Sequence, residues 1–408
     1  MHRKKILAVA VAGALGVGAA GVAVAQTTVA TPIGNVTIYG KLYPEVTTTD
    51  FSNQTAAGAT VSTLSAAPSG LANAKRPSID ASNSRIGFRG NEGVGGGLNV
   101  VWQIEQRVRI DTGAGALFAN RDSFLGLAGG FGTVKLGFMD TAYKQVGDQL
   151  SFLGISSGNF VSNSNVLSRL GFGGGATGFD FHLRQPNSLM YESPQMAGVQ
   201  ILATYSPDEL KTTTKEAVLT SLGVKYEVGP LYLALGHENH KDYFGGSNNV
   251  PAAIASPVTG ATGVHSKDTA TRATVMVKFG GTTVSVDVAQ MEWDETGGAA
   301  GTFANYKNTR TAAGVQQKFG NITGQFSVVS SPAGSCTLNG GAACSTTGLE
   351  AKQLNLGGSY AFSRRTLVFA ILSKLDNGIS STYNNTANAT VSVGEDITQF
   401  AVGVSHSF

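Results

Sequence analysis

The last eleven residues of the chain, TQFAVGVSHSF, alternate strictly between two kinds of side chain. Phe400, Val402, Val404 and Phe408 fall on one parity, and small or polar residues fill the other. A period of two is typical of a β-strand with one apolar and one polar face. A strand that ends on an aromatic residue suits a closed membrane barrel, whose last strand must pair with its first. We therefore expect an all-β transmembrane barrel, with these four residues as its C-terminal assembly signal.

The opposite end of the chain has the pattern of a secretory signal peptide. Residues 3–5 are basic, residues 6–24 are apolar, and the small-x-small triplet Ala23-Val24-Ala25 precedes Gln26. This pattern predicts export and cleavage after Ala25, which leaves residues 26–408 as the barrel. A retained membrane helix is the alternative, because the apolar stretch is near the length that spans a bilayer. No other long apolar run follows, so we expect the remaining chain to cross the membrane with strands.

The charge content is low for a protein without apolar helices. Charged residues make up 13% of the chain and hydrophobic residues 42%, whereas soluble domains carry roughly a quarter charged residues. Removing the three basic residues of the signal peptide leaves 26 of the 29 basic residues, against 26 acidic ones. The balance gives no support to nucleic-acid binding, which depends on excess positive charge. What matters is therefore where the charges lie.

Alternating segments recur along the whole chain and are separated by connections of two kinds. Short turns such as Gly229-Pro230, Gly280-Gly281 and Gly320-Asn321 alternate with long stretches rich in Gly, Ser, Thr and Asn. This order predicts an antiparallel barrel with short turns at one end and long loops at the other. We count sixteen strands of about ten residues each, the length a tilted strand needs to cross the apolar layer. Eighteen strands remain an alternative, because the strand pattern of residues 159–187 is ambiguous. The patterns at both termini argue against a soluble β-sandwich.

Several motifs resemble those of the Gram-negative general-diffusion porins, in particular the β-proteobacterial outer-membrane porins. They are VTIYGK at 36–41, SRIGFRG at 84–90, EGVGGGL at 92–98, NRDSFLGLAGGFGTVKLG at 120–137 and NSLMYESP at 187–194. The resemblance is strongest over residues 36–140. It implies a homotrimer in the outer membrane, surrounded by lipid and lipopolysaccharide and inserted by the barrel-assembly machinery through its C-terminal strand. It also implies a third outer loop, about residues 141–183, that folds into the lumen and narrows it.

Strand parity assigns several basic side chains to the lumen. Arg85 and Arg89 are opposite in parity to the apolar residues of their strand, as are Arg107 and Lys135 in theirs. An arginine or lysine facing lipid at mid-depth would cost roughly 2–4 kcal/mol, so an inward orientation is strongly favoured.

The resemblance adds a row of basic residues on the pore wall. By motif, this row is Lys41 (YGK), Arg85 (SRIGF) and Arg121 (NRDSF). Arg169 (LSRLG) matches the family's pattern less securely, and Arg184 competes for the same place. In the porins this row faces acidic residues of the inward-folded loop.

The loop that would face this row is poor in acidic residues. Asp148 and Asp180 are its only carboxylates, against Lys144, Arg169 and, directly after it, Arg184. A narrow pore lined with more cations than anions concentrates anions. We therefore expect anion preference. The alternative is that Arg85 and its neighbours only pair with Glu105 and Asp122 and stiffen the wall, and both can hold together.

No motif in the chain indicates catalysis, a cofactor or a metal site. Cys336 and Cys344 lie in one long loop, and the oxidising periplasm favours a disulfide between them. His237 and His240 lie in HENH, which is not the HExxH pattern of zinc proteases. We expect a passive diffusion channel for small anionic or neutral hydrophilic solutes. The alternatives are a substrate-specific channel for an organic acid or phosphate-like anion, and a mainly structural or adhesive surface barrel.

Overall fold

The computed structural model describes residues 27–31, 34–81, 83–114, 118–147, 149–153, 159–173, 179–258 and 263–408. The predicted signal peptide, residues 1–25, and Asp148 lie outside the described residues. In the described part of the chain, no helix has the length and apolar character needed to cross a membrane.

Nearly all regular structure in the described residues is β-strand. Three short helical segments occur: α1 (Ala142–Val146), α2 (Ser164–Leu167) and the 3₁₀ helix η1 (Asn339–Gly341). The strands are β1 (Thr27–Thr31), β2 (Gly34–Leu42), β3 (Glu45–Ser52), β4 (Arg76–Asp80), β5 (Arg85–Gly95), β6 (Leu98–Arg107), β7 (Ser123–Gly129), β8 (Gly132–Asp140), β9 (Arg184–Glu192), β10 (Val199–Ser206), β11 (Val218–Val228), β12 (Leu231–Lys241), β13 (His265–Phe279), β14 (Thr282–Thr296), β15 (Phe303–Phe319), β16 (Ile322–Ser331), β17 (Ser335–Leu338), β18 (Ala351–Ala361), β19 (Thr366–Asn377) and β20 (Asp396–Ser407).

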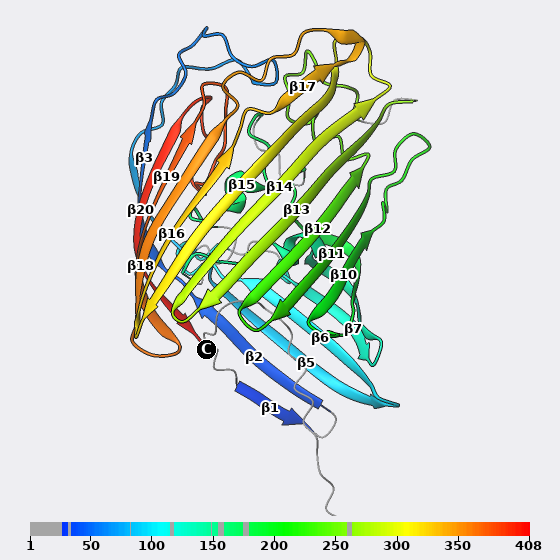
Figure 1. Ribbon diagram of the computed structural model, residues 1–408, viewed down its shortest axis with the longest axis vertical. Helices are drawn as coiled ribbons and strands as arrows, with labels where there is room; N and C mark the ends of the chain where they lie inside the picture. Colours follow the sequence, from blue (N-terminus) through cyan, green and yellow to red (C-terminus); the bar gives the residue numbers. More distant parts are fainter. Residues whose placement is uncertain are drawn as a thin grey trace, which may run out of the picture.

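These strands form one antiparallel sheet that closes into a barrel (Figure 1). Strands β2 and β3 are two halves of the first wall strand, and β4 and β5 are two halves of the second. Counted this way, the described wall has sixteen strands, which confirms the predicted number. Two further strands lie outside this count: β1 pairs with β2 along the edge beyond the end of β20, and β17 pairs with the loop end of β15.

The last strand closes the barrel, as its alternation predicted. β20 pairs with β19 on one side and with β2 and β3 on the other. The backbone N–H groups of Phe408 and Gly40 each donate to the other residue's carbonyl, at 3.0 and 2.9 Å. A Cβ atom at Gly40 would lie 2.3 Å from Cζ of Phe408. Only glycine therefore fits beneath the terminal ring.

The predicted two-residue turns are confirmed. Gly229-Pro230, Gly280-Gly281 and Gly320-Asn321 each connect two paired strands directly. The first residue of each turn has a positive φ of 56°, 59° and 57°, respectively. Glycine adopts this conformation without steric cost, and hairpin turns that match the strand twist require it. These turns lie at the end of the barrel opposite the long loops (Figure 1).

Three strands are much longer than the expected ten or so residues. β13 and β14 have 15 residues each and β15 has 17. Their outward side chains near the short turns are apolar, as in the row formed by Val277, Val284 and Val315. Towards the loops the outward row becomes polar, with Thr271, Gln290 and Thr309 in register. These strands therefore continue beyond the apolar layer, which sequence length alone did not reveal.

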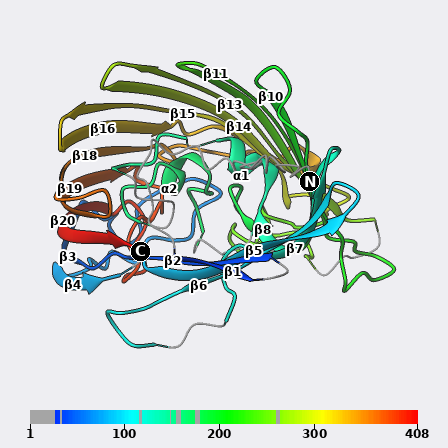
Figure 2. The same ribbon diagram turned by 90° about the horizontal axis from the view of Figure 1, so that it is seen from below.

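The described residues of the connection between β8 and β9, residues 141–183, lie inside the barrel as expected for the third loop (Figure 2). Helix α1 packs against β10, β11 and β12, and α2 packs against β15, β16 and β18. A Cβ atom at Gly223 or Gly236 would lie 2.7 or 3.0 Å from the Val146 side chain. Two glycines in adjacent strands therefore let α1 approach the wall closely. We call this connection the inner loop.

Candidate pore-lining site

The inner loop is tied to one side of the barrel by wall side chains that bond its backbone. Gln325 accepts from the N–H of Leu153 at 2.7 Å, and the amide of Gln353 donates to the carbonyl of Phe160 at 2.7 Å. Asn355 donates to the carbonyl of Val161 at 3.1 Å. Buried backbone polar groups require such partners. Together with the packing of α1 on β10 and the bond from Asn159 to Glu45 of β3 at 2.8 Å, these contacts show that the inner loop covers the wall from β10 to β20 and reaches β3.

Three basic residues with side chains on the inner face of the wall lie in one row across β2, β5 and β6. Lys41 is the cross-strand partner of Arg85, and Arg85 is the partner of Arg107. Neighbouring strands are about 4.8 Å apart, and like charges directly opposite one another destabilise a sheet. A row of three cations is therefore not explained by the stability of the wall alone.

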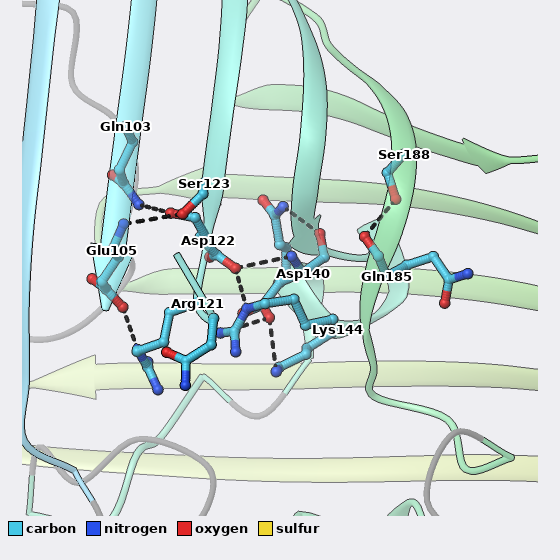
Figure 3. A network of polar contacts seen from close by, with 12 residues as sticks. Gln103, Glu105, Arg121, Asp122, Ser123, Asp140, Lys144, Gln185 and Ser188 are labelled. Carbon is cyan, nitrogen blue, oxygen red and sulfur yellow. Dashed lines mark hydrogen bonds and ion pairs between the residues drawn. The ribbon is translucent and has the colours of Figure 1, made fainter. Parts of the chain in front are cut away.

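Glu105 partly compensates this row. Its carboxylate accepts from the Tyr39 hydroxyl at 3.0 Å and lies 3.7 Å from Nε of Arg85. Arg121, from the β6–β7 connection, forms an ion pair with the same carboxylate. Figure 3 shows Glu105 and Arg121 joined in this way. A single carboxylate thus holds two arginines.

A second group of charges adjoins the first. Arg184 forms an ion pair with Asp122, and its Nη2 lies 3.0 Å from Oδ1 of Asp140. Nζ of Lys144, in α1, lies 2.8 Å from the same oxygen. Figure 3 shows Asp122, Asp140 and Lys144 in this network. Because Lys144 belongs to the inner loop, these pairs also attach its first turn to β8.

Together these residues have an excess of positive charge. We call them the basic cluster: Lys41, Arg85, Arg107, Arg121, Lys144 and Arg184, with Glu105, Asp122 and Asp140. Six cations face three carboxylates within this set. The wall-stiffening alternative therefore describes part of the geometry, since Glu105 pairs with Arg85, but Asp122 pairs with Arg184 instead. The pairing leaves the cluster positive.

The other predicted residues lie elsewhere. Arg89 lies over the ring of Tyr39, with Cζ 5.1 Å from its centroid. Lys135 pairs with Glu192 at 2.6 Å, at a level about six residues, or roughly 20 Å, closer to the short turns than Arg85. Arg169, in the inner loop, is exposed and donates to the carbonyl of Asn384 at 2.9 Å. Lys135 and Arg169 are therefore not part of the basic cluster.

Two inward arginines beneath the inner loop were missed. Arg272, in β13, pairs with Asp287 at 2.8 Å, and a Cβ atom at Gly147 would lie 2.3 Å from its Cζ. Arg310, in β15, bonds carbonyls of the inner loop. Both have inward parity, with polar or small neighbours at alternate positions, so the parity argument could have been extended to these strands.

The remaining predicted features concern the long loops and metals. Cys336 and Cys344 form a disulfide, with Cα atoms 5.7 Å apart, in the β16–β18 connection that contains β17. Asp180 is partly buried in the inner loop and accepts from the N–H of Leu170 at 3.0 Å; the arginines that act on it are Arg169 and Arg310, which lie outside the basic cluster. No group of three or more His, Cys, Asp or Glu side chains in the described ranges is arranged to hold a metal ion.

Sixteen antiparallel strands, an apolar outer face and an inward-folded loop define a transmembrane β-barrel of the porin type. The chain belongs to the Gram-negative porin family, whose model matches residues 8–380. Membership of this family, together with the barrel, places the protein in the outer membrane.

Relatives and solved structures agree with this assignment. Major outer membrane protein P.IA of Neisseria meningitidis serogroup C is 35% identical over 146 residues, which are 36% of this chain and 34% of that protein. The match thus spans about a third of the length of this relative. Major outer membrane protein P.IB of Neisseria lactamica is 26% identical over 327 residues, 80% of this chain and 83% of that one. A structure titled anion-selective porin from Comamonas acidovorans shares the fold, with a TM-score of 0.66, 21% identity, and 92% and 100% of the two chains covered.

Proposed function

We propose that this protein is a passive outer-membrane channel for small hydrophilic solutes and that it prefers anions. The observation that carries the proposal is the row formed by Lys41, Arg85 and Arg107 on three neighbouring strands. It lies on β2, β5 and β6, whereas the two helices of the inner loop pack against strands between β10 and β18. A water-filled passage beside this row concentrates anions and repels cations. The solute gradient drives the flux, and the proposal includes no catalytic step.

Ion pairing within the basic cluster lowers its field without cancelling it. Glu105, Asp122 and Asp140 neutralise at most three of the six cations. The same pairs hold the arginine side chains in place, so that their charge stays directed at the passage. Wall stiffening and anion preference are therefore compatible.

Relatives support the proposal by analogy. The Comamonas acidovorans protein is described as anion-selective, and a structure of OmpT of Vibrio cholerae is described as a trimer form. We extend both properties to this chain as proposals: anion preference on the basis of its own basic cluster, and a homotrimer on the basis of family membership. Lipid, lipopolysaccharide and the barrel-assembly machinery are the further partners expected of such a protein.

The test is a reversal potential in planar bilayers, measured on protein refolded from residues 26–408. With a salt gradient across the bilayer, we expect a potential of the sign given by anion movement. Arg85→Glu changes the net charge of the cluster by two and should weaken or reverse that sign. Lys352→Glu is the matched control, because it makes the same charge change on an exposed residue of the outer face. A potential that follows the cation in the unmodified protein would contradict the proposal.

A second candidate is a channel specific for a multivalent organic acid or a phosphate-like anion. It is favoured by the spacing of the three cations, since residues on adjacent strands about 4.8 Å apart can contact one carboxylate or phosphate together. Such a channel would show saturable block of its conductance by one ligand. A conductance that rises in proportion to the concentration of each anion tested would favour the general channel instead.

A further inference from the structure

We propose that Arg310, in β15, is the residue that positions the inner loop and thereby sets the width and steadiness of the passage. The inference rests on the proposed channel function but concerns a residue on the opposite wall from the basic cluster. Arg310 does not face the passage directly. It acts through the loop that lies over it, so it is a positioning residue.

Arg310 bonds the inner loop at two points. Its side chain is fully buried, and Nη1 donates to the carbonyl of Val166 at 2.9 Å and also to the carbonyl of Arg169. These carbonyls belong to α2 and to the residues directly after it. The last carbonyls of a helix have no partner within the helix, so they need donors from elsewhere. One guanidinium supplies both bonds.

The guanidinium itself is held in place by aromatic rings of the wall and of a long loop. Its Cζ lies 5.8 Å from the ring centroid of Trp293, in β14, and 5.5 Å from that of Tyr383, in the β19–β20 connection. Trp293 and Tyr383 are fully buried. A planar cation between such faces is favourable and restricted in its motion. The two loop carbonyls are therefore fixed to a rigid part of the barrel.

The charge of Arg310 would be expensive without this role. Among the described residues it forms no ion pair within 4.0 Å. Asp180 interacts with it electrostatically and accepts from the N–H of Leu170 in the same loop segment. A buried charge without a close partner lowers the free energy of unfolding, and an apolar residue at this site would not carry that penalty. Arg272, by contrast, is balanced by Asp287. The cost is explained if Arg310 holds the loop.

The test compares three variants with a neighbour on the same strand. Arg310→Met removes both bonds, Arg310→Gln keeps one amide donor, and Arg310→Lys restores the charge and donors without the planar fork. Thr309→Val, an exposed residue on the outer side of β15, is the control. Two readouts are needed: single-channel conductance with its closing events, and the rate at which an added protease cleaves the folded protein within residues 149–173.

For Arg310→Met we expect cleavage of the inner loop to be at least about tenfold faster, because the loss of even one of its two bonds from a charged donor produces about that factor. Its conductance levels should spread and its brief closures multiply, while the anion sign of the reversal potential is retained because the basic cluster is intact. Arg310→Lys should recover most of the protection, and Thr309→Val should match the unmodified protein. If Arg310→Met does not fold, Arg310→Gln takes its place, with an intermediate effect.

The outcomes separate this inference from the channel proposal. A protein that conducts, and whose Met or Gln variant keeps the normal conductance and loop protection, overturns the role of Arg310. A protein that does not conduct contradicts the channel function, and the protease readout still decides whether Arg310 positions the loop.

Discussion

At the scale of single residues, Glu105 is the residue on which the basic cluster depends most. Among the described residues it is the one carboxylate that pairs with both Arg85 and Arg121, and it also accepts from Tyr39. Its side chain is 10% exposed, so little water replaces these partners if it is removed. It therefore limits the positive field and at the same time makes the row of cations tolerable.

We expect Glu105→Gln to strengthen the anion preference and to destabilise the barrel. Removing one partner of a largely buried ion pair leaves uncompensated charge and costs about 3 kcal/mol. Glu292→Gln is the control, because Glu292 pairs with Lys307 on the exposed outer face, where such pairs contribute less than about 1 kcal/mol. Reversal potentials and urea unfolding of both variants test this. An unchanged reversal potential in Glu105→Gln would show that Glu105 does not limit the field.

Asp180 and His182, both in the inner loop, titrate with opposite effects. Burial raises the pKa of Asp180 to about 6, although Arg169 opposes the shift. Burial, together with Lys144 and Arg272, holds the pKa of His182 well below its usual range. The folded loop thus binds the Asp180 proton more tightly than the unfolded loop, and the His182 proton less tightly. The Asp180 contribution favours the folded loop in acid and is lost as the pH rises through about 6, whereas the His182 contribution is lost as the pH falls below about 6.5.

The two contributions can be separated by mutation. In Asp180→Asn only the His182 contribution remains, so cleavage of the inner loop by protease should accelerate between about pH 7 and pH 5. In His182→Gln only the Asp180 contribution remains, so cleavage should slow over the same range, by about 1.4 kcal/mol of loop stability, because pH 5 lies one unit below the pKa of the folded group. Cleavage rates at several pH values, corrected for the protease's own pH profile, give the answer. The same sign in both variants would show that other groups dominate.

At the scale of elements, the barrel is closed by one close contact between its first and last strands. Gly40 lies directly beneath the ring of Phe408, and the two residues exchange both backbone hydrogen bonds. A side chain at position 40 would displace the ring and disturb the pairing of β2 with β20. The closure thus depends on a small residue in one strand and a large one in the other.

A double-mutant cycle tests this closure. Gly40→Ala alone should destabilise the barrel by about 1–3 kcal/mol through overpacking against Phe408. Phe408→Ala removes the ring, so in that background Gly40→Ala should cost less, although its Cβ would still lie 2.8 Å from the Arg85 carbonyl oxygen. The difference is the coupling between the two residues. Unfolding midpoints in denaturant, read from the electrophoretic shift of the folded barrel, measure all four proteins. Equal costs in both backgrounds would mean that the terminal ring does not rest on Gly40.

At the scale of the whole molecule, the field of the basic cluster acts over a distance set by salt. The Debye length is about 10 Å at 0.1 M and about 3 Å at 1 M. Selectivity that arises from the net charge of the cluster should therefore decrease strongly over this range of salt. We expect the ratio of anion to cation permeability to fall towards the ratio of the free ion mobilities. A ratio independent of salt would indicate direct binding of the anion, as in the substrate-specific channel.

Much of the fold was predictable because its signals are local. The alternation of residues 398–408, the turn at Gly229-Pro230 and the regular change from short to long connections predicted sixteen antiparallel strands, and the sheet confirms them. Part of the basic cluster was predictable for the same reason: parity alone places Arg85 and Arg107 on the inner face. The ends of β13, β14 and β15 could not be predicted from the sequence, because their outward residues beyond the apolar layer are polar and resemble those of a loop.

The path of the inner loop could not be predicted from the sequence. Its position depends on contacts between residues far apart in the chain: Arg310 bonds carbonyls 144 and 141 positions away, and Gln353 bonds one 193 positions away. No local pattern encodes such pairs, because periodicity shows which way a side chain points and not what it meets. The chain alone thus defines a porin barrel, since every backbone group in a membrane must be paired within the sheet. Only the folded barrel decides which wall strands the loop contacts, and therefore which row of cations we propose to border the passage.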